Sequence, residues 1–162
     1  DSENHPDYPL FYEKLEEMLI HLAKLIVSDG EGASKFIEYH VLSAANEEQA
    51  RKLVRSISDS ALVKTAMFGR DPNWGRIVCA AGNAGVGFDH EKADLFLGNE
   101  KIQVQVLEKG KPAEIDRNQI KRLLRDSHIV LKLHVNEGEA TATGWGADLT
   151  TDYVMFNSVY TT

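Results

Sequence analysis

The sequence predicts an α+β fold in which helices pack on a largely antiparallel or mixed sheet. In the first half of the chain, apolar residues recur at the spacing of a helix face. In the second half, apolar and polar residues alternate between clusters of turn residues, as they do in hairpins. With 162 residues, and no internal repeat or linker, the chain is expected to form a single unit, residues 1–162.

The first predicted element is an amphipathic helix over residues 9–28. Its apolar residues lie three and four positions apart: Leu15, Met18, Leu19, Leu22, Leu25 and Ile26. Gly30 provides a stop for this helix. The run from Phe36 to Ser43 is rich in β-branched and aromatic residues and predicts a strand.

A second helix is expected after Asn46, whose side chain can cap it, with Glu47 and Glu48 favoured by the positive end of the helix dipole. Residues 61–68 show no decisive pattern and are left unassigned. The organisation of the chain therefore becomes predictable again only after residue 70.

The sequence Asp71-Pro72-Asn73 predicts a turn that starts another apolar, helical segment from Trp74 to Ala81. This segment contains the single cysteine, Cys79. Because no histidine or other base lies near Cys79 in the sequence, we interpret it as a small core residue and not as a nucleophile.

Hairpin patterns dominate the second half. Residues 94–97 and 101–107 alternate at the strand period across a Gly98-Asn99 turn, and residues 108–111 form another turn. Asp116 with Gln119 resembles a capping box for a short helix that ends near Arg125.

The last third predicts a strand pair and a helix. Residues 128–135 place alternate apolar side chains on one face, and residues 136–139 turn the chain into a partner strand over residues 140–145. These two strands are expected to pair directly. Residues 148–160 predict a final helix with one apolar stripe, formed by Leu149, Tyr153, Phe156 and Tyr160.

Charge and composition exclude several functions. The chain carries 18 basic and 25 acidic residues, a net charge of −7, which repels phosphate backbones and anionic lipid surfaces, so no nucleic acid and no membrane partner is expected. No apolar run approaches the roughly 20 residues that cross a bilayer. The single cysteine fits a reducing cytoplasmic location. Because the first residue is Asp1 and not Met, we expect a processed product or a piece of a longer chain.

Histidines offer no metal site in this sequence. None of the six pairs with a cysteine or a carboxylate at ligand spacing: His5, His21, His40, His90, His128 and His134. Surface or hydrogen-bonded core positions are the favoured interpretation for all of them.

Three segments could bind a small molecule. In Asp29-Gly30-Glu31-Gly32, two carboxylates near a helix end could attract an ammonium group, although on spacing alone a helix terminus with solvated acids is favoured. Arg70 and Arg76 could grip a carboxylate, although a structural turn with Trp74 in the core is favoured. Asn157 lies beside the apolar stripe of the last helix, where it could bind a ligand or cap a neighbouring element.

Three sequence blocks carry a resemblance to a known family. They read DGEGASKF from Asp29, SALVKTAMFGRDPNWGRI from Ser60 and WGADLTTDYVMFNSVYTT from Trp145. In content, order and spacing they resemble the signature blocks of the ornithine acetyltransferase (glutamate N-acetyltransferase) family of arginine biosynthesis. The resemblance extends over nearly the whole chain.

The resemblance implies a self-cleaving acetyltransferase of the N-terminal-nucleophile type. In this family a precursor cuts itself before a threonine, and the new N-terminal threonine is the nucleophile. The acetyl group passes from N-acetylornithine to that threonine and then to glutamate, without a metal or organic cofactor. Whether acetyl-CoA is a second donor stays open.

The chain departs from the family pattern at its start. The family's β chain opens several dozen residues upstream with a Thr-Met-Leu-type sequence that is absent here, so the resemblance implies the C-terminal part of a β chain and no catalytic residue in this chain. The implied partners are the α chain and the upstream β-chain segment, in an α2β2 assembly. Glu31, Asn157 and Thr162 match the family's substrate-binding positions. The alternative is a non-catalytic amino-acid-binding or structural subunit.

Overall fold

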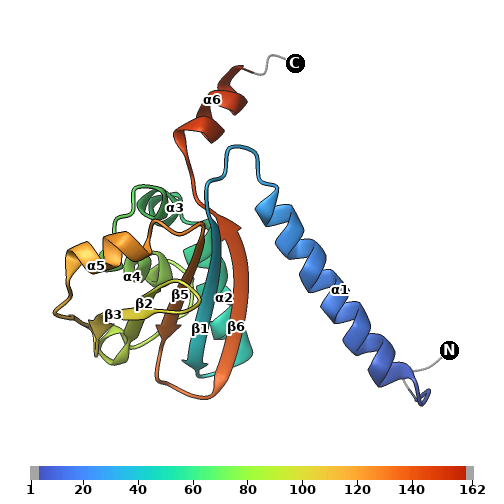
Figure 1. The fold of residues 1–162 in the computed structure, drawn as a ribbon. Coiled ribbons are helices and arrows are strands. Elements are labelled where there is room, and N and C mark those ends of the chain that lie inside the picture. The colour runs from blue at the N-terminus through green and yellow to red at the C-terminus, as the bar shows by residue number, and fades with distance from the viewer. Residues whose placement is uncertain (1–3, 160–162) are drawn as a thin grey trace.

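The computed structural model describes residues 4–159 (Figure 1). Its elements, in chain order, are α1 (Tyr8–Ser28), β1 (Phe36–Ala44), α2 (Glu47–Asp59), α3 (Ala61–Phe68), α4 (Trp74–Gly82), the 3-10 helix η1 (His90–Lys92), β2 (Asp94–Gly98), β3 (Gln103–Glu108), β4 (Lys111–Pro112), α5 (Arg117–Leu123), β5 (His128–His134), β6 (Ala140–Ala147) and α6 (Thr151–Val159). The predicted helices and strands form within the described residues, and α3 occupies the segment for which the sequence showed no decisive pattern. The last predicted helix, residues 148–160, is observed as Thr151–Val159, and Tyr160 lies outside the described residues.

The strands form one six-stranded sheet in the order β4-β3-β2-β5-β1-β6. Only β1 and β5 run parallel, with Phe36 opposite His128, and every other neighbouring pair is antiparallel. The expected α+β fold with a largely antiparallel, mixed sheet is therefore confirmed.

The direct pairing predicted for residues 128–135 and 140–145 is wrong, because β1 lies between β5 and β6. The connection after β5 passes around the end of β1, where the N–H groups of Glu137 and Gly138 donate to the Ser43 carbonyl. This short connection is long enough to cross two strand spacings of about 4.8 Å each. The central position of β1 agrees with its burial: Ile37 and Tyr39 are fully buried, and both edges of the strand are paired with neighbours.

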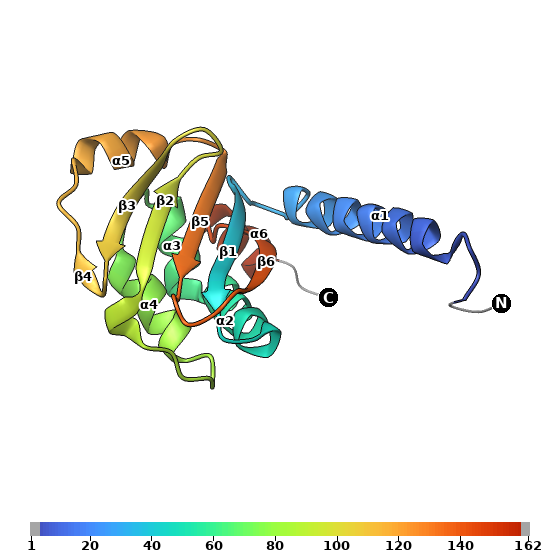
Figure 2. The same cartoon turned by 90° about the horizontal axis from the view of Figure 1, so that it is seen from below.

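The core lies between one face of the sheet and helices α2, α3 and α4 (Figure 2). Alternate residues of the central strands point into it, as the strand period requires. The largest fully buried side chains include Ile37, Tyr39, Leu95, Leu97, Ile129 and Leu131 from the sheet, Leu53, Ile57, Met67 and Ile77 from these three helices, and Ile120 from α5. The opposite face of the sheet carries Glu38, His40 and His128, which are only partly buried.

Local hydrogen bonds explain where the helices begin. The Asn46 side chain accepts from the Gln49 N–H at 2.9 Å and caps α2, as expected. The Ser60 hydroxyl caps α3 by accepting from the Val63 N–H, so the start of this helix has a local signal in the sequence. Asp116 caps α5 by accepting from the Asn118 N–H at 2.8 Å.

The interpretation of Cys79 as a core residue is wrong, because its side chain is exposed. The buried residues of α4 are Ile77, Ala80 and Ala81, which belong to one face of the helix. Cys79 lies on the other face, two positions from Ile77.

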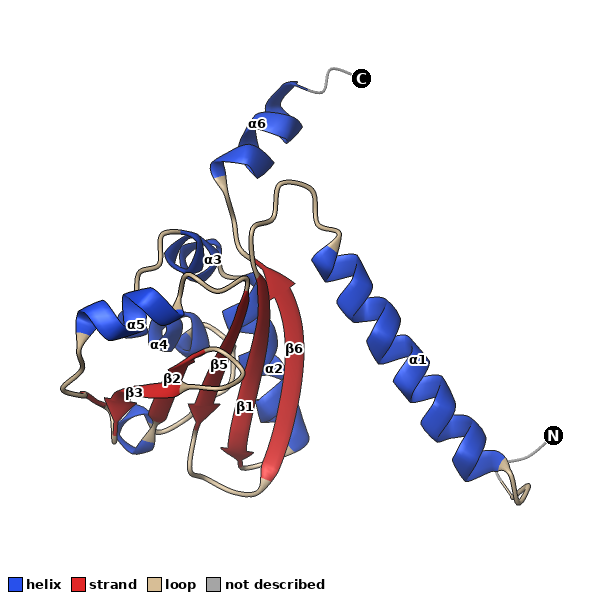
Figure 3. Cartoon of the chain, viewed as in Figure 1, coloured by secondary structure: helices blue, strands red, loops and turns tan. Residues whose placement is uncertain are grey.

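Helix α1 extends away from the sheet, and none of its residues is buried (Figures 1 and 3). The predicted amphipathic helix is present, but its apolar residues are exposed, including Leu10, Phe11, Met18, Leu19, Leu22, Leu25 and Ile26. No helix within residues 4–159 combines the length and the apolar character that crossing a membrane requires. An apolar surface of this extent marks an interaction site.

Candidate functional site

The loop between α1 and β1 carries the Asp29-Gly30-Glu31-Gly32 sequence and lies beside the first turn of α6 (Figure 1). The Thr150 hydroxyl joins the two segments, since it donates to the Gly32 carbonyl and accepts from the Tyr153 N–H at 3.0 Å. Gly32 has a φ of +72°, and a Cβ built there would lie 2.5 Å from the Tyr153 nitrogen. Only glycine fits this position, so the sequence fixes how closely the loop approaches α6.

Replacing Gly32 by alanine is expected to lower the free energy of unfolding by about 2–4 kcal/mol, because the positive φ and the contact with α6 both oppose a side chain. Gly85→Ala is the matched control, since Gly85 has a φ of +69° with no atom near its Cβ position. The control should lose only about 1 kcal/mol. Urea unfolding measures both; equal losses would contradict a tight contact between the loop and α6.

Asp148 fixes the other end of the loop. Its Oδ1 accepts from the backbone N–H groups of Ser34 and Lys35, at 2.8 and 2.9 Å, and its Oδ2 accepts from the Ser34 hydroxyl. Asp148 is only 6% exposed. A buried carboxylate with three donors is a strong anchor, because each hydrogen bond is strengthened by the charge. We call Ser34, Lys35, Asp148 and Thr150 the loop clamp.

Lys35 extends the loop clamp to the end of α5. Its side chain is buried, and its ammonium donates to the carbonyls of Leu124 and Asp126 at 2.8 and 3.1 Å. Burial lowers the pKa of Lys35, while the charge of Asp148 acts in the opposite direction. Lys35 therefore connects the start of β1 to the end of α5 and to the segment before β5. Its ammonium group is occupied by these carbonyls and is not free to contact a ligand.

The structure places the predicted site residues as follows. Glu31 is exposed on the clamped loop, and Asn157 is exposed on α6, where its Nδ2 donates to the Tyr153 carbonyl at 2.8 Å. Thr162 lies outside the described residues. The loop contact thus brings the segments of Glu31 and Asn157 to the same end of the sheet, although they are far apart in the sequence.

The two arginines of the FGRDPNWGRI block have different surroundings. The Arg76 guanidinium donates to the Leu62 carbonyl and to the Thr65 hydroxyl, at 3.1 and 3.3 Å, so it ties α4 to α3. Arg70 is exposed and has a φ of +56° at the turn after α3. Trp74 packs against the core but is only half-buried.

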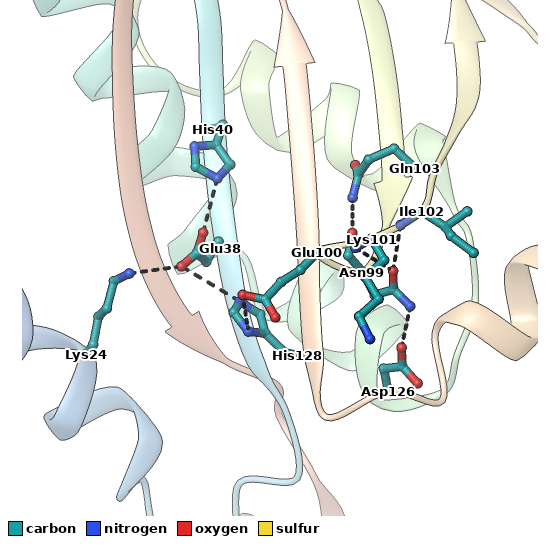
Figure 4. Close-up of polar contacts among 10 residues, drawn as sticks. All are labelled: Lys24, Glu38, His40, Asn99, Glu100, Lys101, Ile102, Gln103, Asp126 and His128. Carbon is teal, nitrogen blue, oxygen red and sulfur yellow. Dashed lines mark hydrogen bonds and ion pairs between the residues drawn. The ribbon is translucent and has the colours of Figure 1, made fainter.

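A second polar cluster lies on the open face of the sheet, where Glu38 contacts three cationic or basic side chains (Figure 4). The Lys24 ammonium is 3.1 Å from Oε1 of Glu38, and the Nε2 atoms of His40 and His128 are 3.3 and 3.7 Å from the carboxylate. Burial alone would raise the pKa of Glu38, but the hydrogen bond and charge of Lys24, aided by both histidines, hold this pKa below its ordinary value.

This cluster attaches α1 to the sheet. Besides its pair with Glu38, the Lys24 ammonium lies 5.3 Å from the centre of the Trp145 ring, which adds a cation–π contact. A cavity of about 470 Å³ adjoins the cluster, and Lys24, Glu38, Glu100 and His128 contribute to its lining. Neither Glu31 nor Asn157 lines this cavity. Within residues 4–159 we find no set of three or more histidine, cysteine or acidic side chains placed to hold a metal ion.

A mixed sheet with helices on one face and a clamped glycine loop at one end defines the class of two-layer α+β domains. The ArgJ family model matches residues 1–162, and the chain belongs to this family. Its relatives include the arginine biosynthesis bifunctional proteins ArgJ of Caldanaerobacter subterraneus subsp. tengcongensis, 44% identical over 96% of this chain, and of Staphylococcus epidermidis, 42% identical over 100% of it. In both cases the match covers 39% of the relative, so the chain spans about two fifths of the length of these curated relatives.

The fold itself has been solved in a relative. A crystal structure of the arginine biosynthesis bifunctional protein argJ from Bacillus halodurans superimposes with a TM-score of 0.89 at 37% sequence identity. The match covers 99% of this chain and 74% of the solved chain. The resemblance stated from the three sequence blocks is thereby confirmed.

Sequence reasoning missed the loop clamp. Ser34 and Lys35 lie in the first signature block, and Asp148 and Thr150 lie in the third. One signal was available: both blocks contain polar residues close to a candidate site residue, Glu31 in the first block and Asn157 in the third. The pairing between them could not be predicted, because it joins positions at opposite ends of the chain.

Proposed function

We propose that this chain is the C-terminal part of the β chain of a glutamate N-acetyltransferase, which moves an acetyl group from N-acetylornithine to glutamate. Family membership supports the reaction, and the loop clamp is the observation that carries the role of this chain. Because Gly32 contacts the first turn of α6, the carboxylate of Glu31 and the amide of Asn157 belong to one end of the domain. They form one wall of a substrate pocket that other polypeptide completes.

The covalent chemistry requires a hydroxyl from outside this chain. A threonine oxygen attacks the acetyl carbonyl of N-acetylornithine, the amide C–N bond breaks, and ornithine leaves with the proton from the hydroxyl. The neutral amine of glutamate then attacks the acetyl ester, which restores the threonine hydroxyl. No cofactor takes part in either step.

Within this scheme, Glu31 attracts an ammonium group, either that of the substrate or that of the nucleophile's own amine. Asn157 and Thr162 hydrogen-bond the amino-acid end of the ligand. The loop clamp holds Glu31 in place, since a displacement of about 1 Å is enough to weaken catalysis severely.

The exposed apolar face of α1 supports the proposed partners, the α chain and the upstream β-chain segment. Obligate interfaces are large and apolar, and α1 offers such a surface along its whole length. An α2β2 assembly is the proposed oligomer. The competing proposal, a non-catalytic amino-acid-binding or structural subunit, rests on the same fold without the nucleophile.

Expression of the complete gene followed by mass analysis and an acetyl-transfer assay distinguishes these proposals. We expect the sequence of this chain to lie in a polypeptide that begins with threonine, an α chain to copurify with it, and glutamate to be acetylated by N-acetylornithine. A parallel reaction with acetyl-CoA tests the second donor. A monomer that binds amino acids, as shown by a raised melting temperature, but transfers no acetyl group would favour the non-catalytic subunit instead.

A further inference from the structure

A second cavity of about 470 Å³ is lined by none of the loop-clamp residues. Its lining comes in part from α5, β3 and β4, which lie together on one side of the domain in Figure 2. It is lined by the Asp71–Asn73 turn, the start of α4, the β3–β4 hairpin and α5. The turn belongs to the FGRDPNWGRI block, the most distinctive motif of the sequence, to which the proposed acetyl transfer assigns no role. The volume falls in the range of small-molecule sites.

Part of the lining of this cavity is apolar. The half-buried Trp74 lines it, and Val106, Pro112 and Ile115 contribute further apolar side chains. A half-exposed indole beside apolar surface offers a stacking platform for a planar ring, because stacking on an aromatic face is tolerant of the ring's identity.

The lining also includes two cationic side chains. Arg117 and Lys121 both line the cavity, and they are four residues apart on α5, so they lie on one face of that helix. Neither forms an ion pair with any side chain in the described part of the protein. Two like charges at this spacing repel each other slightly, and a bound anion would remove that repulsion.

The surrounding surface strengthens this local field. Residues 109–125 carry six cations, Lys109, Lys111, Arg117, Lys121, Arg122 and Arg125, but only two carboxylates, Glu114 and Asp116. The whole chain has a net charge of −7, so positive charge is concentrated in this one segment. Such a concentration attracts anionic ligands to a surface that would otherwise repel them.

One acidic side chain, Asp71, also lines the cavity. The Asp71 carboxylate accepts from Nδ2 of Asn73 at 3.2 Å, which leaves further acceptor capacity on its oxygens. Carboxylates in nucleotide sites accept hydrogen bonds from ribose hydroxyls. The cavity therefore combines an aromatic platform, an acceptor for a sugar hydroxyl and two cations for phosphate.

We propose that this cavity binds a nucleoside polyphosphate group, with the base on Trp74, a ribose hydroxyl on Asp71 and the phosphates on Arg117 and Lys121. The group comes from one of two sources, a free nucleotide or the nucleotide end of coenzyme A. In the second case the inference rests on the proposed acetyl transfer, because the cavity would then hold the carrier of an acetyl donor.

The test is calorimetric titration of the complete protein, with the polypeptides that copurify with it, using ADP and coenzyme A as separate probes. We expect saturable binding that weakens as salt is added. Tighter binding of coenzyme A than of ADP identifies the coenzyme as the source, and the reverse order identifies a free nucleotide. Absence of binding for both probes overturns the proposal, whether or not the protein transfers acetyl groups.

Three variants locate the site. The double substitution R117A/K121A should weaken binding at least about tenfold, and Trp74→Leu should weaken it by about the same factor. Arg122→Ala is the matched control, since Arg122 lies on the same helix but does not line the cavity, and it should change affinity less than about twofold. An equal loss in the control and the double variant would overturn the assignment. If Trp74→Leu fails to fold, the exposed arginine and lysine positions still decide the question.

Discussion

Replacing Asp148 by alanine is expected to lower the free energy of unfolding by about 4 kcal/mol. The partly buried N–H group of Ser34 and the buried N–H group of Lys35 would lose their acceptor, and the Ser34 hydroxyl would lose a charged partner. Each unsatisfied buried donor costs about 1–3 kcal/mol, and hydrogen bonds to a charged group are at the strong end of the scale. Asp148 also offsets the burial of the Lys35 ammonium, which would lose that compensation.

Chemical denaturation measures this loss as a lower midpoint with an unchanged dependence on denaturant. Asp59→Ala is the control, because the Asp59 carboxylate is 67% exposed and pairs only with Arg55 at 3.5 Å. Exposed pairs of this kind contribute about 0–1 kcal/mol. A loss below about 1 kcal/mol for Asp148→Ala would show that the loop holds its position without the loop clamp.

Replacing Glu31 by glutamine in the complete enzyme is expected to lower kcat/KM for acetyl transfer by about 10- to 100-fold with no change in melting temperature. The factor corresponds to one charge-assisted hydrogen bond, about 1.5–3 kcal/mol. Stability should not change, because Glu31 is exposed and the loop is fixed by its neighbours. Asp29→Asn is the matched control, an exposed acid on the same loop, and should alter the rate less than about threefold.

The pattern of the kinetic effect identifies the group that Glu31 attracts. N-acetylornithine carries a free side-chain ammonium, so a rise confined to its KM would assign Glu31 to the substrate. A fall in kcat with both substrates would assign it to the amine of the nucleophile, which takes part in both steps. Unchanged kinetics for both substrates would remove Glu31 from the site.

Most of the fold could be predicted because its signals are local. The caps at Asn46 and Asp116 and the apolar spacing within each helix act over a few residues, and the corresponding elements form where expected. The order of the strands could not be predicted, because the short turn after β5 is compatible both with a hairpin and with a connection around β1. Whether β6 pairs with β5 or with β1 depends on the burial of Ile37 and Tyr39 in the centre of the sheet, which only the tertiary structure shows.

The candidate site was only partly accessible to sequence reasoning. Glu31 and Asn157 could be singled out through the family blocks, but the residues that hold their segments together could not. Thr150 and Gly32 meet through one hydroxyl and one carbonyl, and no periodicity in the sequence encodes such a pair. The prediction that Cys79 is buried was wrong for a related reason. The sequence shows that α4 is apolar, but only the tertiary structure shows which face of this helix packs against the core.

The central position of β1 also determines when this domain can fold during synthesis. β1 leaves the ribosome before both of its neighbours, β5 and β6, which lie in the last third of this sequence. Until they emerge, an apolar strand has two unpaired edges and can associate with other nascent chains. The contacts that close the sheet join distant parts of the polypeptide, which slows folding and lengthens the time during which β1 stays unpaired.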